Sequence, residues 1–352
     1  MSERTKSQNP DYTPINYDEI PADLYELLPS FGNYSVFHSR EWHRFISRAM
    51  HWKIKGLVYT DKDGQPVYFL PYVSKWRMLK RVNVCLPLTY SITPVFRSGL
   101  NPSNIDLQNE LPQLEIHGQL NTGNAKHISN HFTTWLDLQS HDNIDEIFRA
   151  TNKSNIQRKI KKARKIGVTV RVTNDTKDYR IFSDLQTETR KRQGAPTYPK
   201  DFFSIMHEEL MPSGLCKLFL AFYNDTPVSG VIVIDDSDSA IYGYGASVSD
   251  RDLLRLGINQ ITMWSAIEDA FLNGKKRFEF GSTSIHHPDL LTYKERWGGE
   301  SSNLVYTYYS NDENQIDIDQ GGSMVSMGSW LLRKIPLGLY KKISPTLLKL
   351  VI

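Results

Sequence analysis

Tyr242-Gly-Tyr244-Gly-Ala-Ser247 opens the stretch that decides the fold, which continues through Phe280-Gly281-Ser282-Thr283 to Tyr293-Lys294-Glu-Arg296-Trp297-Gly-Gly299. Glycines and small hydroxyls end short apolar strands here, as they do where a backbone must approach a ligand closely. Because side chains alternate along a strand, we expect Tyr242 and Tyr244 to share one strand face. The pattern predicts the floor and walls of a binding cleft.

The composition is that of a globular protein with room for two domains, since 39% of the 352 residues are hydrophobic and 23% are charged. Cys85 and Cys216 lie in apolar runs without metal-ligand spacing, so we predict buried reduced thiols and no metal site. Residues 1–9 are polar and lack the apolar core of a secretory signal. No run reaches the ~18 apolar residues of a membrane span. We therefore expect a cytoplasmic protein, with any membrane contact peripheral and at the inner face.

The first half of the chain is expected to hold an N-terminal extension (1–36) and a first domain (37–150). Ser39 can cap a helix that carries Trp42 and Met50. Two strands over 53–59 and 66–73 flank the turn residues Asp63 and Gly64, which predicts a hairpin. Residues 98–131 are rich in Asn and Gln and lack periodicity, so we predict a variable loop there.

A basic stretch over residues 151–174 contains eight Lys or Arg and no acid. Ile156, Ile160 and Ala163 fall at helical spacing, and Gly167 stands where a helix should stop. The charged residues on the other faces include Arg158, Lys161, Lys162 and Lys165. Two interpretations stay open: a solvated helix face, or a surface for an anionic partner such as RNA, a pyrophosphate-linked precursor or lipid.

From residue 168 the predicted elements become regular, in the order β-α-α-β-β-β-α-β-α-β. The strands are expected over residues 168–172, 217–223, 228–234, 240–246, 277–281 and 304–309, and the helices over 178–192, 200–210, 256–272 and 290–296. After a polar linker (311–322), the tail carries an amphipathic pair of helices broken at Pro336 and Pro345. Packing against the body and binding at a membrane surface are both open for this pair.

That element order is found in GNAT acyltransferases, and an ordered set of motifs narrows the resemblance. The set comprises Ala163-Arg-Lys-Ile-Gly167-Val-Thr-Val-Arg171, Thr189-Arg-Lys-Arg192-Gln-Gly194-Ala-Pro196, Phe202-Phe203, Tyr242-Gly-Tyr244-Gly-Ala-Ser247, Phe280-Gly281-Ser282 and Lys294…Trp297-Gly298-Gly299. Together they resemble the FemAB-like family, which includes peptidoglycan interpeptide-bridge aminoacyltransferases and BioF-like acetyltransferases. The resemblance covers roughly residues 37–345.

The resemblance implies a mixed α/β fold with two tandem GNAT-like domains and catalysis in the second (151–310), followed by a linker and C-terminal helices (311–352). Characterised Fem members move an amino acid from aminoacyl-tRNA to an amine of a cell-wall precursor, without metal. One departure concerns the loop that binds the acyl-CoA pyrophosphate in typical GNATs. Leu254 precedes Gly257 by three, where that loop has Gln or Arg, and Asn259 replaces a small residue. The donor therefore stays open between acyl-CoA and aminoacyl-tRNA, since Arg251 and Arg255 at a helix N-terminus could still hold phosphates.

Three residues are candidates for the chemistry. Lys294 matches the family's aromatic-Lys motif, which implies a cation near the transferred carbonyl, although a solvated lysine would look the same in sequence. Glu279 is a candidate for an acceptor ligand or base, with a buried salt bridge as the alternative. Tyr244, with Tyr242, offers a hydroxyl for ligand contact or general-acid catalysis, but both could be ordinary strand aromatics.

The substrate-binding candidates share a place at strand or helix ends and are Arg190, Arg192, Tyr242, Ser247, Arg251, Arg255, Gly281, Ser282, Thr283 and Trp297. Arg190 and Arg192 could clamp an anion, or could simply be charges at a helix end. No nucleophile elbow and no convincing Cys–His pair occur, so direct attack in a ternary complex is favoured over an acyl-enzyme.

The sequence thus predicts an N-acyltransferase that moves an acyl or aminoacyl group onto an amine of a cell-envelope or exopolysaccharide precursor. It would hold no permanent cofactor, its partners would be the donor, the acceptor and in some cases tRNA, and DNA is not expected. A non-catalytic adaptor that binds RNA or a membrane surface is the alternative. The oligomeric state stays open.

Overall fold

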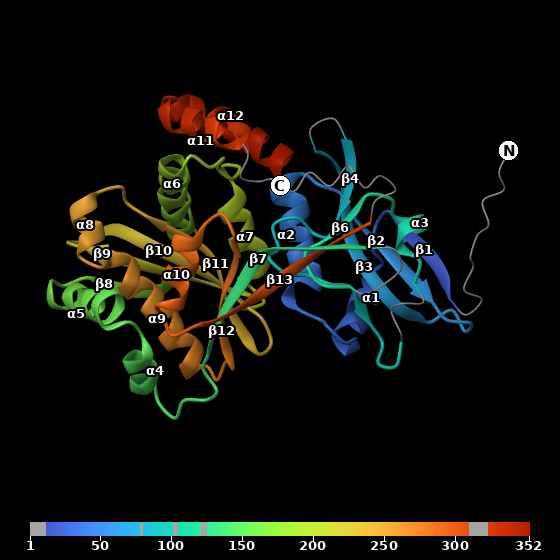
Figure 1. The fold of residues 1–352 in the computed structure, drawn as a ribbon, viewed down its shortest axis with the longest axis horizontal. Helices are drawn as coiled ribbons and strands as arrows, with labels where there is room; N and C mark the ends of the chain where they lie inside the picture. The colour runs from blue at the N-terminus through green and yellow to red at the C-terminus, as the bar shows by residue number, and fades with distance from the viewer. Residues whose placement is uncertain (1–11, 78–79, 101–104, 121–124, 310–322) are drawn as a thin grey trace. The chain divides into compact units, whose positions relative to one another are not determined.

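A computed structural model of the chain describes residues 12–77, 80–100, 105–120, 125–309 and 323–352. The described residues divide into two compact units. The first contains 12–43, 52–129 and 305–309, and the second contains 44–51, 130–304 and 323–352. Helix α2 and strands β7 and β13 contribute residues to both units. Figure 1 gives the labels used below.

The first unit is built on antiparallel strands with short helices. Its elements are β1 (Thr13–Tyr17), α1 (Ala22–Leu27), the start of α2 (Arg40–Met50), β2 (Ile54–Thr60), β3 (Pro66–Arg77), β4 (Lys80–Val84), β5 (Val95–Phe96), α3 (Leu107–Glu110), β6 (Leu114–Ile116), the start of β7 (Lys126–Asp137) and the end of β13 (Glu300–Tyr309). The strand order is β1-β2-β3-β4-β6-β13, with β5 beside β3 and a parallel pairing between β4 and β6.

Two local predictions in this half are confirmed and one is wrong. The Ser39 hydroxyl accepts from the backbone N–H of Trp42 at 3.1 Å and begins α2 as a cap does. The β2–β3 hairpin forms around Gly64, whose φ of +74° suits the turn. The predicted loop over 98–131 instead includes α3, β6 and the start of β7, because long-range pairing supplies strand order that local periodicity does not show.

The second unit has one sheet with helices on both faces. Its strands run in the order β7-β12-β11-β10-β9-β8, with only the β11–β12 pair parallel. They are the end of β7, β8 (Thr169–Thr173), β9 (Cys216–Tyr223), β10 (Thr226–Asp235), β11 (Ser239–Ser247) and β12 (Arg277–Ser284), with the start of β13. The helices are the end of α2, α4 (Ile144–Ala150), α5 (Arg158–Lys165), α6 (Thr176–Gln193), α7 (Phe202–Leu210), α8 (Arg251–Arg255), α9 (Ile258–Leu272), α10 (Pro288–Glu295), α11 (Ser323–Lys334) and α12 (Leu337–Val351).

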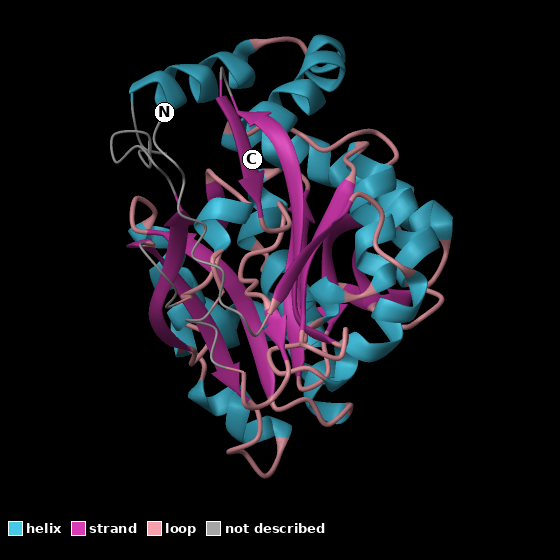
Figure 2. Cartoon of the chain, turned by 90° about the vertical axis from the view of Figure 1, so that its right-hand side faces the viewer, coloured by secondary structure: helices cyan, strands magenta, loops and turns pink. Residues whose placement is uncertain are grey.

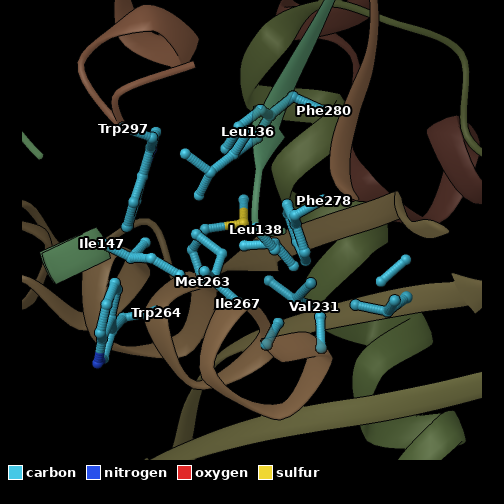
Figure 3. Packing of buried hydrophobic residues seen from close by; sticks show 14 of the residues in the cluster. Leu136, Leu138, Ile147, Val231, Met263, Trp264, Ile267, Phe278, Phe280 and Trp297 are labelled. Atoms are coloured by element: carbon cyan, nitrogen blue, oxygen red, sulfur yellow. The ribbon is translucent and has the colours of Figure 1, made fainter. Parts of the chain in front are cut away.

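The main core of this unit lies between the sheet and helix α9. Figure 3 shows Met263, Trp264 and Ile267 of α9 packing with Val231, Phe278 and Phe280 from the strands. We call this side of the sheet the α9 face. On the opposite side, Phe182 of α6 and Phe203 of α7 meet edge to face with ring centroids 5.0 Å apart, and we call that side the α6 face.

The boundary between the units differs from the expected one at 150/151. Leu136 and Leu138 of β7 and Ile147 of α4 belong to the core of the second unit, because β7 pairs with β12. Residues 130–150 therefore fold with the second unit. Cys85 and Cys216 are both free and buried, as predicted.

The tail is helical as predicted, but one expected break is absent. The chain breaks between α11 and α12 at Pro336, whereas α12 continues through Pro345. Proline removes one backbone hydrogen bond inside a helix, and we infer that the packing of the buried side of α12 compensates here. Ser344, beside the proline, is fully buried and accepts from the backbone N–H of Thr197 at 2.6 Å.

Candidate active site

Strand β11 carries a β-bulge at Gly243. Its register with β10 pairs Tyr244 with Ile232 and Tyr242 with Val233, which leaves Gly243 as the extra residue. Adjacent residues of β10 point to opposite faces, so the two tyrosines do as well. Tyr242 packs against the core on the α9 face, and the prediction that both share one face is wrong. Strand alternation fails because the bulge inserts one residue between them.

The parallel strands β11 and β12 separate close to this bulge. Their pairing ends with Ile241 opposite Glu279, although both strands continue for several residues. Gly243 and Gly281 each lie two residues beyond that last pair. The β12–β7 register also breaks between Glu279 and Ser282, and Gly281 has a φ of +68°, which favours glycine. The two facing edges are thereby released from the hydrogen-bond ladder between them.

Lys294 closes this point from α10. Its Nζ donates to the carbonyl oxygens of Gly281 at 3.0 Å and Ser282 at 2.9 Å, and the residue is only 5% exposed. Burial lowers the pKa of Lys294 to about 7. The structure thus brings together three of the predicted site residues. An ammonium has three N–H donors, and the two carbonyls use two of them.

Glu279 lies at the last paired position of β12. The Ser239 hydroxyl donates to its Oε1 at 2.8 Å, and burial raises the pKa of the carboxyl to about 7. Among the residues described, it forms no ion pair, so the salt-bridge alternative is not what the structure has. Its pairing with Ile241 places it on the α6 face, the same side of the sheet as Tyr244.

Tyr244 is enclosed by aromatic rings. Its ring centroid lies 5.4 Å from that of Tyr198 and 5.3 Å from that of Phe203, both edge to face. The Arg190 guanidinium lies over the Tyr198 ring at 4.7 Å. Burial raises the pKa of Tyr244 well above its ordinary value, with Tyr198 adding to the rise and Arg190 opposing it. The sequence argument missed Tyr198, although it follows the quoted Gly194-Ala-Pro196 motif by two residues.

Arg192 and Ser247 are brought together where α6 meets the end of β11. Arg192 Nη2 donates to Ser247 Oγ at 3.2 Å, and Ser247 N donates to Thr189 Oγ1 at 3.0 Å. Burial lowers the pKa of Arg192, which remains a cation at neutral pH. Thr189 is a second residue that the sequence argument missed, although it opens the Thr189-Arg-Lys-Arg192 motif.

The remaining candidates separate. Arg251 and Arg255 are exposed on α8, whose first N–H groups are capped by the Asp250 carboxylate. Thr283 is buried, and its hydroxyl makes no hydrogen bond within the described chain. Trp297 is fully buried in the apolar core of the second unit, and Gly298 follows it with a φ of +84°.

The basic helix forms as predicted. Ile160 and Ala163 of α5 are fully buried, and Gly167 follows its end with a φ of +87°. Four of the exposed cations of this helix share one side of it, and we call them the α5 basic face: Arg158, Lys161, Lys162 and Lys165. In the part of the chain that the structure describes, none of these four pairs with an acid.

Three further properties of the described residues concern metal ions, membranes and cavities. No group of three or more His, Cys, Asp or Glu side chains is placed to hold a metal ion. Likewise, no helix there has both the length and the apolar character that crossing a bilayer requires. A shallow depression of about 310 Å³ lies between α4 and α10, lined by Ala150, Asn152, Thr292, Glu295 and Arg296.

Most of the second unit matches a known family of domains. Residues 150–295 match the family model described as an acetyltransferase (GNAT) domain. No protein with a curated description matches the chain. FemX shares the fold with a TM-score of 0.62 at 16% identity, over 85% of this chain and 98% of its own. L-PGS from Bacillus licheniformis has a TM-score of 0.52 at 10% identity, over 91% and 99%. At these identities the structural likeness establishes the fold alone.

The splayed parallel pair lies within residues 150–295, and the match of this segment to a GNAT acetyltransferase domain supports an acyltransferase. Within that class, the mixed α/β fold is that of FemX over nearly its whole length, as the FemAB-like motifs predicted. Residues 150–295 thus carry an acetyltransferase (GNAT) domain, and the chain as a whole shares its fold with FemX.

Proposed function

We propose that the protein is an N-acyltransferase that moves an acyl or aminoacyl group onto an amine of a cell-envelope or exopolysaccharide precursor. The observation that carries the proposal is the parting of β11 and β12 at Gly243 and Gly281, with Lys294 buried against the carbonyls of that point. Extended backbone edges without a strand partner offer N–H and C=O groups to an extended ligand. The amide groups in the arm of an acyl donor are suited to pair with these strand edges.

The chemistry needs a neutral amine, charge stabilisation for the tetrahedral oxyanion and a proton for the leaving atom. Glu279, with a pKa of about 7, is suited to accept the proton that the attacking amine loses. The third N–H of Lys294 is suited to the oxyanion. A tyrosine hydroxyl, from Tyr244 or Tyr242, then protonates the leaving sulfur or oxygen, and the proton on Glu279 returns to the tyrosinate through solvent. The new C–N bond replaces the C–S or C–O bond of the donor, without an acyl-enzyme.

The donor would be held by cations on both sides of the site. Arg192 and Ser247 meet at the end of β11, and Arg190 lies over Tyr198 nearby. Guanidinium groups of this kind bind phosphate or carboxylate. The α5 basic face adds four cations that pair with no acid in the described part of the chain, and such cations suit the phosphates of an aminoacyl-tRNA. These features support both donors, and the departures at Leu254 and Asn259 count against a standard acyl-CoA loop.

The test compares donors and one variant. Purified protein is heated with acetyl-CoA or with aminoacyl-tRNA, and the donor that binds is expected to raise the unfolding temperature. Amide formation is then followed by mass spectrometry with amino-sugar and peptide amines. We expect Lys294→Met to lower kcat by about a hundredfold or more. Lys276→Met is the control, because the Lys276 side chain is 53% exposed and its ammonium pairs with Asp238.

Full activity of Lys294→Met would exclude the assigned role of Lys294 at the transferred carbonyl. Absence of amide formation with either donor, in protein shown to be folded, would exclude the proposed reaction for these amines. If catalytically dead variants still support the biological role, the non-catalytic adaptor would replace it.

A further inference from the structure

The C-terminal helix α12 has a buried stripe that attaches it to the second unit. Tyr340, Ser344 and Leu348 recur every four residues and are at most 4% exposed. The Tyr340 hydroxyl donates to Ala195 O at 2.6 Å, and Lys341 pairs with Asp184 of α6 at 3.2 Å. Figure 1 shows α11 and α12 lying across the outer side of α6. Figure 2 draws the helices of the chain, this pair included, in cyan. The orientation of α12 is therefore fixed by contacts within the unit.

A second apolar stripe on α12 remains uncovered. Leu339, Ile343, Leu347 and Leu350 follow one another at spacings of four, four and three, which aligns them on one side of the helix. Each is between 37% and 48% exposed. In α11, Trp330 is 58% and Leu331 54% exposed. Single exposed apolar residues are ordinary, but an ordered stripe of four beside a packed one marks an interaction surface.

The charged side chains of α11 and α12 have one sign. Residues 323–352 contain Arg333, Lys334, Lys341, Lys342 and Lys349, and no acid. Lys342 and Lys349 are seven residues apart and so share a side of α12, next to the exposed stripe. Lysine stems lie along apolar surface while their ammonium groups reach outward. Apolar residues, one tryptophan and flanking lysines are the combination that an interface between acyl chains and anionic headgroups selects.

We propose that α12, with the adjoining Trp330 of α11, binds the surface of an anionic phospholipid bilayer, with the helix axis in the plane of the interface. The Leu339–Leu350 stripe enters the acyl boundary, and Lys342 and Lys349 meet the headgroups. A second copy of the chain fits less well. A two-fold contact through this stripe would bring lysines toward lysines with no acid to offset them. The inference does not rest on the proposed reaction, because lipid binding needs neither donor nor acceptor.

The test is sedimentation of the full chain with vesicles of phosphatidylcholine alone or mixed with phosphatidylglycerol. We expect binding to the mixed vesicles that weakens as salt is raised, and little binding to phosphatidylcholine. Leu339→Ser with Ile343→Ser should lower the partition coefficient at least about tenfold. Lys342→Gln with Lys349→Gln should lower it by a similar factor on the mixed vesicles only, since each lysine near such a surface contributes about fivefold.

The matched control is Leu272→Ser, because Leu272 is 74% exposed at the end of α9, away from the stripe. It should bind as the wild type does. The lysine variant leaves both apolar stripes intact, so it tests the proposal even if the serine variant folds poorly. Absence of binding to mixed vesicles, or binding unchanged in both variants, would overturn the proposal. So would a dimer in sedimentation equilibrium that the serine variant dissociates while lipid binding is absent.

Discussion

Lys294 is a buried ammonium whose two described partners are neutral carbonyls. Burial holds its pKa near 7, below the ordinary value of 10.5. Between those two pH values the unfolded chain binds a proton that the folded protein does not. The free energy of unfolding therefore contains a contribution that rises with pH from about 7 to 10, at up to ~1.4 kcal/mol per pH unit.

The first prediction is that Lys294→Met loses this rise. Urea unfolding of wild type and variant at several pH values measures it, with Lys276→Met as the control that keeps the wild-type slope. Identical slopes for wild type and Lys294→Met would show that the ammonium is not desolvated as described.

Glu279 has the opposite linkage. Burial raises its pKa from 4.5 to about 7, so over that interval the folded protein binds a proton that the unfolded chain lacks. Stability is lost as pH rises through this window. The second prediction is that Glu279→Gln is more stable than the wild type at pH 8, by up to ~3 kcal/mol, yet slower in kcat by about a hundredfold or more.

The two measurements for Glu279→Gln separate its roles. A purely structural carboxyl would give the stability gain without the rate loss. A wild-type kcat/KM profile that is flat between pH 5 and pH 8 would also contradict the assignment as a base, since the wild-type rate should fall below its pKa.

Helix α9 shows how one glycine sets the position of an element. Gly257 has a φ of +92° before the helix, and an added Cβ would lie 2.5 Å from the backbone oxygen of Lys159. Gly274, after the helix, has a φ of +72°, and a Cβ added there would have no atom within 4 Å. Both positions strain an L-residue, but only the first also produces a clash with backbone.

The third prediction compares these two ends of α9. Gly274→Ala should destabilise the protein by about 1 kcal/mol, and Gly257→Ala by at least ~2 kcal/mol more. Chemical denaturation of both variants measures the difference. Equal effects would mean that α5 and the start of α9 are not in the close contact described.

Across the whole molecule, the charge is concentrated rather than large. The net charge is only +3, yet the α5 basic face has four unpaired cations within eight residues. The fourth prediction is that Lys161→Glu with Lys162→Glu weakens tRNA binding at least about tenfold and reduces its salt dependence, because phosphate contacts release counterions.

Fluorescence anisotropy with labelled tRNA at several salt concentrations measures this effect. Both lysines are exposed, so the unfolding temperature should stay close to that of the wild type. Lys200→Glu with Lys276→Glu, at exposed positions outside α5, is the charge-matched control. If both double variants weaken binding equally, the attraction comes from net charge and not from the α5 basic face.

Much of this architecture could be read from the sequence because its signals are local. The cap at Ser39, the hairpin at Gly64 and the end of α5 before Gly167 each depend on a few neighbouring residues. The order of elements after residue 168 and the acyltransferase class also came from patterns along the chain. Lys294, Gly281 and Ser282 were predicted as site residues from motifs that resemble the FemAB-like family, and the structure brings the three together.

The tertiary structure decided the features that depend on pairing between distant segments. The bulge at Gly243 puts Tyr242 and Tyr244 on opposite faces, and β7 carries residues 130–150 into the second unit. The carbonyls that hold Lys294 exist as partners only because β12 leaves its neighbours at Gly281. Strand register is set by contacts across the sheet, and a single chain position has no local signal for it.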